Sequence, residues 1–177
     1  MQNRFIRPAV LMLGVLGYGQ AKAELAVIDW PPGWQVEPVP VEAGSDVSRQ
    51  RAVKLDAQGN PTMVVELSQS PVEQGHVVNV AGVVLEMRKA VQKNFSEGGY
   101  QSACTRVKAS TLNQVPAAET TCTITLNGGH VLTQTLVAAA GPLKAWALSY
   151  AGTPEGYRLN EGTVLKIRSS LVLDAGQ

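Results

Sequence analysis

The sequence predicts an α+β domain: an antiparallel β-sheet with helices packed on its faces in an α/β/α sandwich, closed by one disulfide. Three observations support this class. Residues 100–150 hold both cysteines, many β-branched residues and three successive hairpin signals. Helical periodicity covers residues 77–96 and, more briefly, 159–173. No charged face runs through residues 120–140, so we expect helices to cover part of both sheet faces.

The first residues have the pattern of a signal peptide. Arg4 and Arg7 precede an apolar run over residues 8–18, and Ala21-Lys22-Ala23 forms a small-x-small cleavage site. A membrane-spanning helix needs about 20 apolar residues, so this run is too short. We predict a signal peptide over residues 1–23, cleaved between Ala23 and Glu24, rather than a buried N-terminal helix. The mature protein would then be periplasmic or secreted.

The remaining residues, 24–177, suit a single domain. The leader holds three of the 15 basic residues and none of the 14 acidic ones, so the mature chain has a net charge of −2. This balance leaves no basic patch, which excludes nucleic acid as an expected partner. We also expect no membrane insertion after cleavage. The oligomeric state is not predicted.

The two cysteines are spaced for a bridge within a hairpin. Placing Cys104 opposite Cys122 centres a turn on Asn113, within residues 111–115. Directly opposed antiparallel residues lie about 4.5–5.5 Å apart at Cα, a distance that a disulfide accepts. Because an exported protein folds in an oxidising compartment, we predict a disulfide between Cys104 and Cys122.

Further turn signals define the rest of the sheet. Asn127-Gly128-Gly129 and Gly141-Pro142 predict two more hairpins after the first. An earlier hairpin joins strands over residues 48–55 and 62–68 through a loop over residues 56–61. Arg49 and Arg51 alternate on its first strand. They are interpreted as a solvated edge, with an anion site as the alternative.

The clearest helix covers residues 77–96. Asn79 is a candidate N-cap, which would leave the preceding valines extended, and Gly98-Gly99 ends the helix. Its polar side holds Glu86, Lys89, Gln92 and Lys93. Its apolar stripe consists of Val80, Val83, Val84, Met87, Ala90, Val91 and Phe95. We interpret the stripe as a core face rather than a partner or membrane surface. The second helix would bury Val164, Leu165, Ile167 and Leu171.

Two tryptophans flank a proline-stiffened turn, in the segment Trp30-Pro31-Pro32-Gly33-Trp34. Such rings often plug the end of a core, where the indole N–H finds a carbonyl. They also serve as rigid anchors at interfaces. We predict that at least one of Trp30 and Trp34 is exposed and belongs to a partner surface.

The residues that usually carry catalysis do not cluster in the sequence. His76 and His130 are isolated, and no metal-ligand spacing, nucleophile elbow or phosphate-binding loop surrounds them. The carboxylates of Glu66, Glu86 and Glu119 are scattered. No catalytic, cofactor or metal site is therefore predicted.

The order of these elements resembles a known fold. Pro32-Gly33-Trp34 after a leader, then a hairpin, a helix, a strand meander and a closing helix resemble the PsbP-like α/β/α sandwich. A photosystem II extrinsic subunit, a Ran-binding nuclear import factor and many bacterial envelope proteins share that fold. The chain more closely resembles an uncharacterised family of short exported pseudomonad proteins, a domain of unknown function. The matching stretches are residues 49–54, 78–80, 87–89, 119–122 and 130–150. The resemblance brings no functional residues with it.

These observations favour a non-enzymatic binding or accessory module of the bacterial envelope, acting on a partner protein or a small ligand. The alternative is a hydrolase or metal-dependent enzyme whose active site is dispersed in the sequence. The fold separates the two: His76, His130 and two or more carboxylates in one pocket would favour an enzyme, and their dispersal would favour binding.

Overall fold

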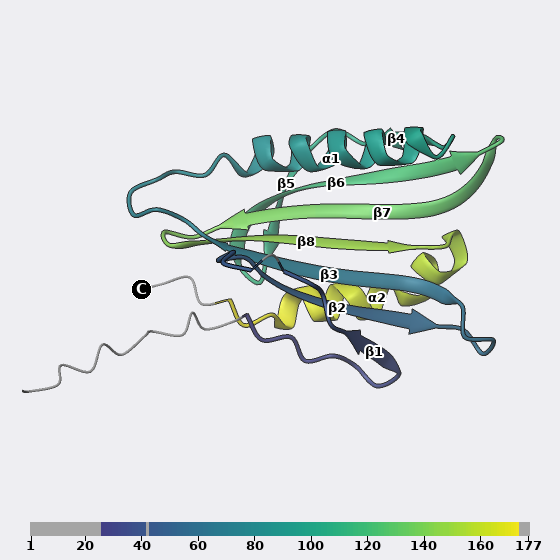
Figure 1. Cartoon of the computed structure of the whole chain (residues 1–177), viewed down its shortest axis with the longest axis horizontal. Coiled ribbons are helices and arrows are strands. Elements are labelled where there is room, and N and C mark those ends of the chain that lie inside the picture. The colour runs from purple at the N-terminus through teal and green to yellow at the C-terminus, as the bar shows by residue number, and fades with distance from the viewer. Residues whose placement is uncertain (1–25, 42, 174–177) are drawn as a thin grey trace, which may run out of the picture.

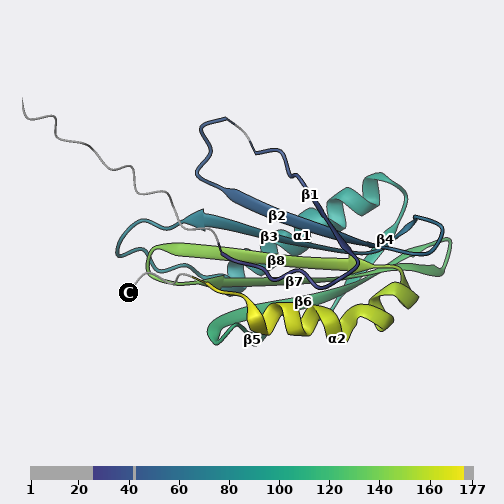
Figure 2. The same ribbon diagram turned by 90° about the horizontal axis from the view of Figure 1, so that it is seen from below.

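Eight strands form one antiparallel sheet, and two helices lie on its opposite faces (Figures 1 and 2). The computed structural model describes residues 26–41 and 43–173. The predicted leader and its cleavage site between Ala23 and Glu24 therefore lie outside the described residues. A sheet with helices on both faces is confirmed, although the molecule is mostly sheet.

The strands hydrogen-bond in the order β1-β2-β3-β8-β7-β6-β4, and β5 also pairs with β6. Both edges of the sheet consist of short strands, which limits their ability to pair with another chain. The strands are β1 (Trp34–Glu37), β2 (Ser48–Leu55), β3 (Pro61–Pro71), β4 (Gln101–Cys104), β5 (Lys108–Leu112), β6 (Val115–Leu126), β7 (Gly129–Ala140) and β8 (Lys144–Gly152).

Two of the tight turns use backbone conformations with positive φ. Asn127 and Gly128 join β6 to β7 with φ of 50° and 80°, and Asn113 and Gln114 join β5 to β6 with φ of 40° and 65°. Two-residue turns with positive φ match the right-handed twist of the strands they connect. The predicted hairpins at these positions are confirmed, as is the one at Gly141-Pro142, where Gly141 N donates to Lys144 O.

The predicted disulfide is confirmed. Cys104 on β4 lies directly opposite Cys122 on β6, with Cα atoms 3.9 Å apart. The arm that carries Cys104 is not one continuous strand, however. Residues 105–107 separate β4 from β5, and the pairing of Lys108 with Glu119 is shifted by one residue from that of the cysteines. An extra residue on one arm produces this kind of interruption.

The predicted β2–β3 hairpin is confirmed, but β2 is not an edge strand. Its loop is closed by Asp56, whose Oδ1 accepts hydrogen bonds from the backbone N–H groups of Gln58 and Asn60. The short strand β1 pairs with the second half of β2, so Arg51 lies opposite Glu37 and forms an ion pair with it at 3.2 Å. The solvated-edge interpretation is therefore wrong for Arg51. Arg49 lies beyond the end of β1 and is exposed, so both the solvated-edge interpretation and the anion-site alternative stay open for it.

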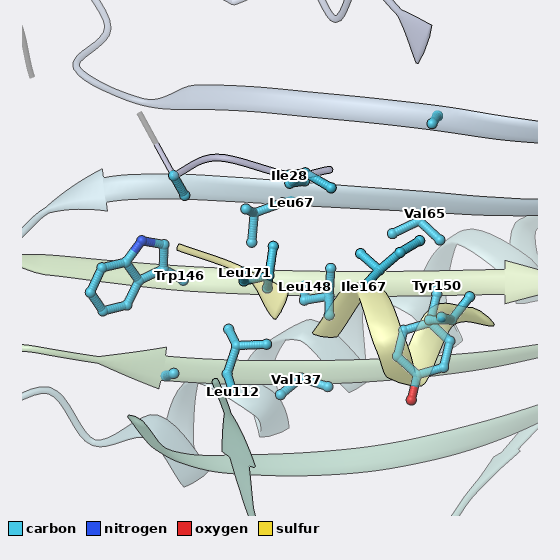
Figure 3. Packing of buried hydrophobic residues seen from close by; sticks show 14 of the residues in the cluster. Ile28, Val65, Leu67, Leu112, Val137, Trp146, Leu148, Tyr150, Ile167 and Leu171 are labelled. Carbon is cyan, nitrogen blue, oxygen red and sulfur yellow. The ribbon is translucent and has the colours of Figure 1, made fainter. Parts of the chain in front are cut away.

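Helix α2 (Pro154–Ser170) packs on one face of the sheet and forms the main core (Figure 3). It begins five residues before the predicted start, because Thr153 caps it by accepting from Gly156 N and Pro154 occupies the first turn. Gly156 allows close approach, since a Cβ there would lie 2.2 Å from Thr62 O. The core contains Met63, Val65, Leu67, Leu112, Val137, Trp146, Leu148, Tyr150, Val164, Ile167 and Leu171. Leu165, predicted to be buried, is exposed, and Arg168 takes the buried position one turn after Val164.

Helix α1 (Val80–Glu97) lies on the other face and buries fewer of its own side chains than α2 does. Asn79 caps it, as predicted, by accepting from Gly82 N at 3.0 Å. Its buried residue is Val84, which contacts Ala118 and Ala138, while Val83 and Ala90 of the predicted stripe are exposed. The helix contacts β4, β6 and β7. Within the described residues, α1 has no comparable contact with β2, β3 or β8, so no described helix covers these strands on this face.

Candidate functional site

A hollow of about 210 Å³ lies where the start of α1 meets the uncovered part of the sheet. We call it the α1 groove. Its wall is apolar and comes from the residues that lead into and begin α1: Val78, Val80 and Val83. Its floor consists of small side chains on three neighbouring strands: Ser68, Ser70, Ala138, Ala145 and Ala147. Ala139 and Trp146 complete the lining.

The register of the sheet explains the floor. Ser68 lies opposite Ala147, which lies opposite Ala138. Directly opposed residues share a face of the sheet, and residues along a strand alternate between faces. Strand β8 therefore presents its alanines to the α1 face, while Trp146 and Leu148 point into the core beneath α2. Small residues on one face and large ones on the other leave the groove hollow beside α1.

The lining of the groove is suited to binding rather than to acid–base chemistry. None of its residues is ionisable. Ser68 and Ser70 are half-buried, and their hydroxyl groups make no hydrogen bond within the described part of the chain. Apolar hollows with a few available polar groups are typical of small-molecule sites.

The two histidines lie at opposite ends of the sheet. His76 lies near Pro71 and Ala145, at the end of β7 that holds Ala140. His130 stands at the other end of that strand, about 30 Å away at the rise of a β-strand, and its Nε2 contacts Leu132 O and Thr133 Oγ1.

The three scattered carboxylates do not converge either. Glu66 lies on β3 on the α1 side, since it is aligned with Ser68, and exposed Glu86 pairs with Lys89 on α1. Glu119 lies on β6 against α2. Among residues 26–41 and 43–173, no three His, Cys, Asp or Glu side chains are grouped in a way that could hold a metal ion.

A second, open hollow of about 610 Å³ lies between α2 and the β5–β6 hairpin. Its charged groups bind one another. Arg168 donates to Glu119 Oε2 at 2.7 Å and to Thr111 O at 2.7 and 2.9 Å, and also contacts Ser110. Lys108 lies 3.1 Å from the other carboxylate oxygen of Glu119. The guanidinium is thus used to hold α2 on the sheet, and we call these residues the Arg168 cluster.

The ionisation of Glu119 fits that structural role. Burial raises the pKa of Glu119, but hydrogen bonds from Ser110, Arg168 and Lys108 outweigh it and hold the pKa below its ordinary value. Arg168 is not among the residues predicted from the sequence. Its position four residues after Val164, within the apolar stripe of the helix, is the signal that could have indicated a buried cation.

The tryptophan pair lies on the α2 face, away from the α1 groove. Trp34 is buried, with 9% of its surface exposed, and plugs the core. Trp30 is half-buried and stacks on it, with ring centroids 6.4 Å apart. A partner surface that includes the Trp34 ring is therefore not available in this structure. A partner surface at Trp30 stays a prediction.

Neither described helix is long and apolar enough to cross a membrane.

Comparison with solved structures supports the PsbP-like fold. The cyanobacterial PsbP protein of Synechocystis is similar with a TM-score of 0.61 and 13% identity, over 82% of this chain and 85% of that one. LpqN of Mycobacterium tuberculosis, involved in cell envelope biogenesis, is similar with a TM-score of 0.53 and 17% identity, over 88% of this chain and 86% of that one. Such low identities show the fold alone.

No curated protein matches the chain significantly. A family model described as a domain of unknown function (DUF4946) matches residues 25–173. The chain therefore belongs to the DUF4946 family.

Proposed function

We propose that this protein is an exported, non-enzymatic binding module of the bacterial envelope, and that the α1 groove holds an apolar group of its ligand. The observation that carries the proposal is the groove itself: an apolar hollow, without ionisable lining, on a sheet face that α1 covers only in part. Burial of apolar surface there would supply the binding free energy.

The size of the groove limits what it holds. Small-molecule pockets usually enclose about 300–1,000 Å³. At about 210 Å³ the groove would take one apolar arm of a ligand. The rest of the ligand would lie over β3 and β8, where no helix of the described chain covers the α1 face.

Two observations support export. The disulfide between Cys104 and Cys122 is typical of proteins that fold outside the cytoplasm. LpqN, a protein with a similar fold, is involved in cell envelope biogenesis. We expect the mature protein in an envelope fraction to begin at Glu24, which intact mass would show. Recovery of the chain there mainly with its leader would contradict export with cleavage.

The groove is tested with two matched variants of α1. Val83 and Leu85 are both 37% exposed, but only Val83 lines the groove. Binding of an uncharged aliphatic probe, octanol, would be followed by displacement of an uncharged naphthylamine fluorophore. Val83→Ser should weaken octanol binding several-fold, and Leu85→Ser should leave it unchanged.

A third variant fills the groove. Ala147→Leu places a larger side chain on its floor and should abolish octanol binding while the protein stays folded. Unchanged binding in both Val83→Ser and Ala147→Leu would show that the α1 groove is not the site.

A further inference from the structure

One charged side chain lies in line with the floor of the α1 groove. Arg49 on β2 is directly opposite Ser68, which is opposite Ala147, which is opposite Ala138 beneath α1. These four residues therefore share one face and form a row across the sheet. Neighbouring strands are about 4.8 Å apart, so Arg49 Cα lies about 10 Å from Ala147 Cα. An extended arginine side chain is long enough to cross the next strand and approach the groove.

The polar groups on this side of the groove are available to a ligand. Arg49 is exposed and makes no hydrogen bond or ion pair with the described residues, in contrast to Arg51, which binds Glu37. The hydroxyl groups of Ser68 and Ser70 likewise have no partner in the described ranges and face the hollow. One guanidinium beside two hydroxyls offers hydrogen-bond donors to an acceptor with a single negative charge.

We infer that the ligand of the α1 groove is an aliphatic carboxylate, with its chain against Val80 and Val83 and its carboxylate bound by Arg49, Ser68 and Ser70. This inference rests on the proposed function of the groove and adds the chemistry of the ligand. A carboxylate fits better than a phosphate monoester, because Arg49 is the one cation in this row and a doubly charged head would leave a charge unbalanced.

Glu66 is the competing group. Glu66 lies two residues before Ser68 on β3 and on the same face of the sheet. It is directly opposite Arg51 and diagonally beside Arg49. Arg51 is held by Glu37 on its other side, so this neighbouring row has two carboxylates and one guanidinium. The carboxylate of the ligand would therefore be attracted by Arg49 and repelled by Glu66. Substitutions at these two positions should change its affinity in opposite directions.

The test compares octanoate with octanol, which have the same chain length and differ in charge. Both are titrated against the full mature protein by displacement of the uncharged naphthylamine fluorophore. Arg49→Gln should weaken octanoate binding roughly fivefold, as expected for loss of a partly exposed ion pair. It should leave octanol binding within about twofold. Glu66→Gln should strengthen octanoate binding and leave octanol unchanged.

The control is Arg158→Gln, which removes an exposed arginine from α2 on the opposite face. It should alter neither titration, and added salt should weaken the octanoate preference of the wild-type protein. Equal binding of octanol and octanoate, or equal effects of Arg49→Gln and Arg158→Gln, would overturn the inference. If octanol binding still depends on Val83 in that case, the proposal that the groove binds an apolar group is retained. Failure of both probes to bind would contradict that proposal as well.

Discussion

The Arg168 cluster gives the sharpest test of how the helix that forms the core is fixed to the sheet. Arg168 and Glu119 have side chains only 10% and 13% exposed, and their charged groups are 2.7 Å apart. Arg168→Met would keep an apolar stem in this position but remove the guanidinium. The carboxylate of Glu119 and the carbonyl group of Thr111 would each lose a donor.

The expected loss of stability follows from these contacts. Removing one partner of a buried ion pair costs about 3–5 kcal/mol, because the other charge stays buried without compensation. Ser110 and Lys108 would still contact Glu119. We therefore expect the lower end, about 3 kcal/mol, for Arg168→Met. Lys108→Met removes a side chain that is 69% exposed and should cost less than about 1 kcal/mol.

Urea denaturation would measure both variants. A double-mutant cycle with Glu119→Gln would isolate the pair, since a neutral amide no longer needs the guanidinium. The double variant should lose clearly less stability than the sum of the single variants. If Arg168→Met cost no more than Lys108→Met, the cluster would not be what holds α2 in place.

The same cluster predicts a dependence on pH. The pKa of Glu119 is lowered in the folded protein, so its ionised form stabilises the fold. That stabilisation is fully present above the ordinary value of 4.5 and is lost as the pH falls through the lower, folded-state pKa. As the pH is lowered from about 5, the wild-type protein should therefore lose more free energy of unfolding than the Glu119→Gln variant. Parallel curves for the two proteins would contradict this reasoning.

Three further variants test the packing and the disulfide. Val84→Ala should cost about 1–2 kcal/mol because Val84 is fully buried between α1 and the sheet, whereas exposed Leu85→Ala should cost less than about 0.5 kcal/mol. Equal losses in urea would show that α1 is docked differently. Trp34→Ala should cost about 3–5 kcal/mol and lower the melting temperature by many degrees, and an unchanged melting temperature would contradict its burial. Thiol labelling of unreduced, exported protein should find neither Cys104 nor Cys122 free, and reduction should cost about 3 kcal/mol; two freely labelled thiols would refute the bridge.

The features predicted correctly from the sequence are those that local chemistry determines. Asn127 and Gly128 tolerate positive φ, so a turn at that position follows from the two residues alone. The cysteine pairing was predictable because Asn113 is the midpoint of Cys104 and Cys122 and lies in the turn, although the pairing next to the turn is shifted by one residue. The N-cap at Asn79 is likewise a short-range signal, confirmed by its hydrogen bond to Gly82 N.

The features that were missed depend on contacts between distant segments. Strand β1 has four residues and forms only because residues 34–37 meet β2, which no local pattern indicates. This pairing also makes Arg51 an inner residue. The α1 groove could not be predicted, because its floor combines Ser68, Ala147 and Ala138 from three strands whose order in the sheet is not the order in the chain.

The two faces of the sheet differ in how much apolar surface they bury, and the proposed binding groove lies on the α1 face. On the α2 face, large side chains such as Trp146, Leu148 and Ile167 are almost completely buried, and the Arg168 cluster closes one side. On the α1 face, the helix buries Val84 over alanines, and within residues 26–41 and 43–173 no helix covers that face of β3 and β8. Most of the free energy of folding must therefore come from the α2 face. Substitutions in the groove at Val83 should change ligand affinity without unfolding the domain, which is why binding variants of this face can be interpreted directly.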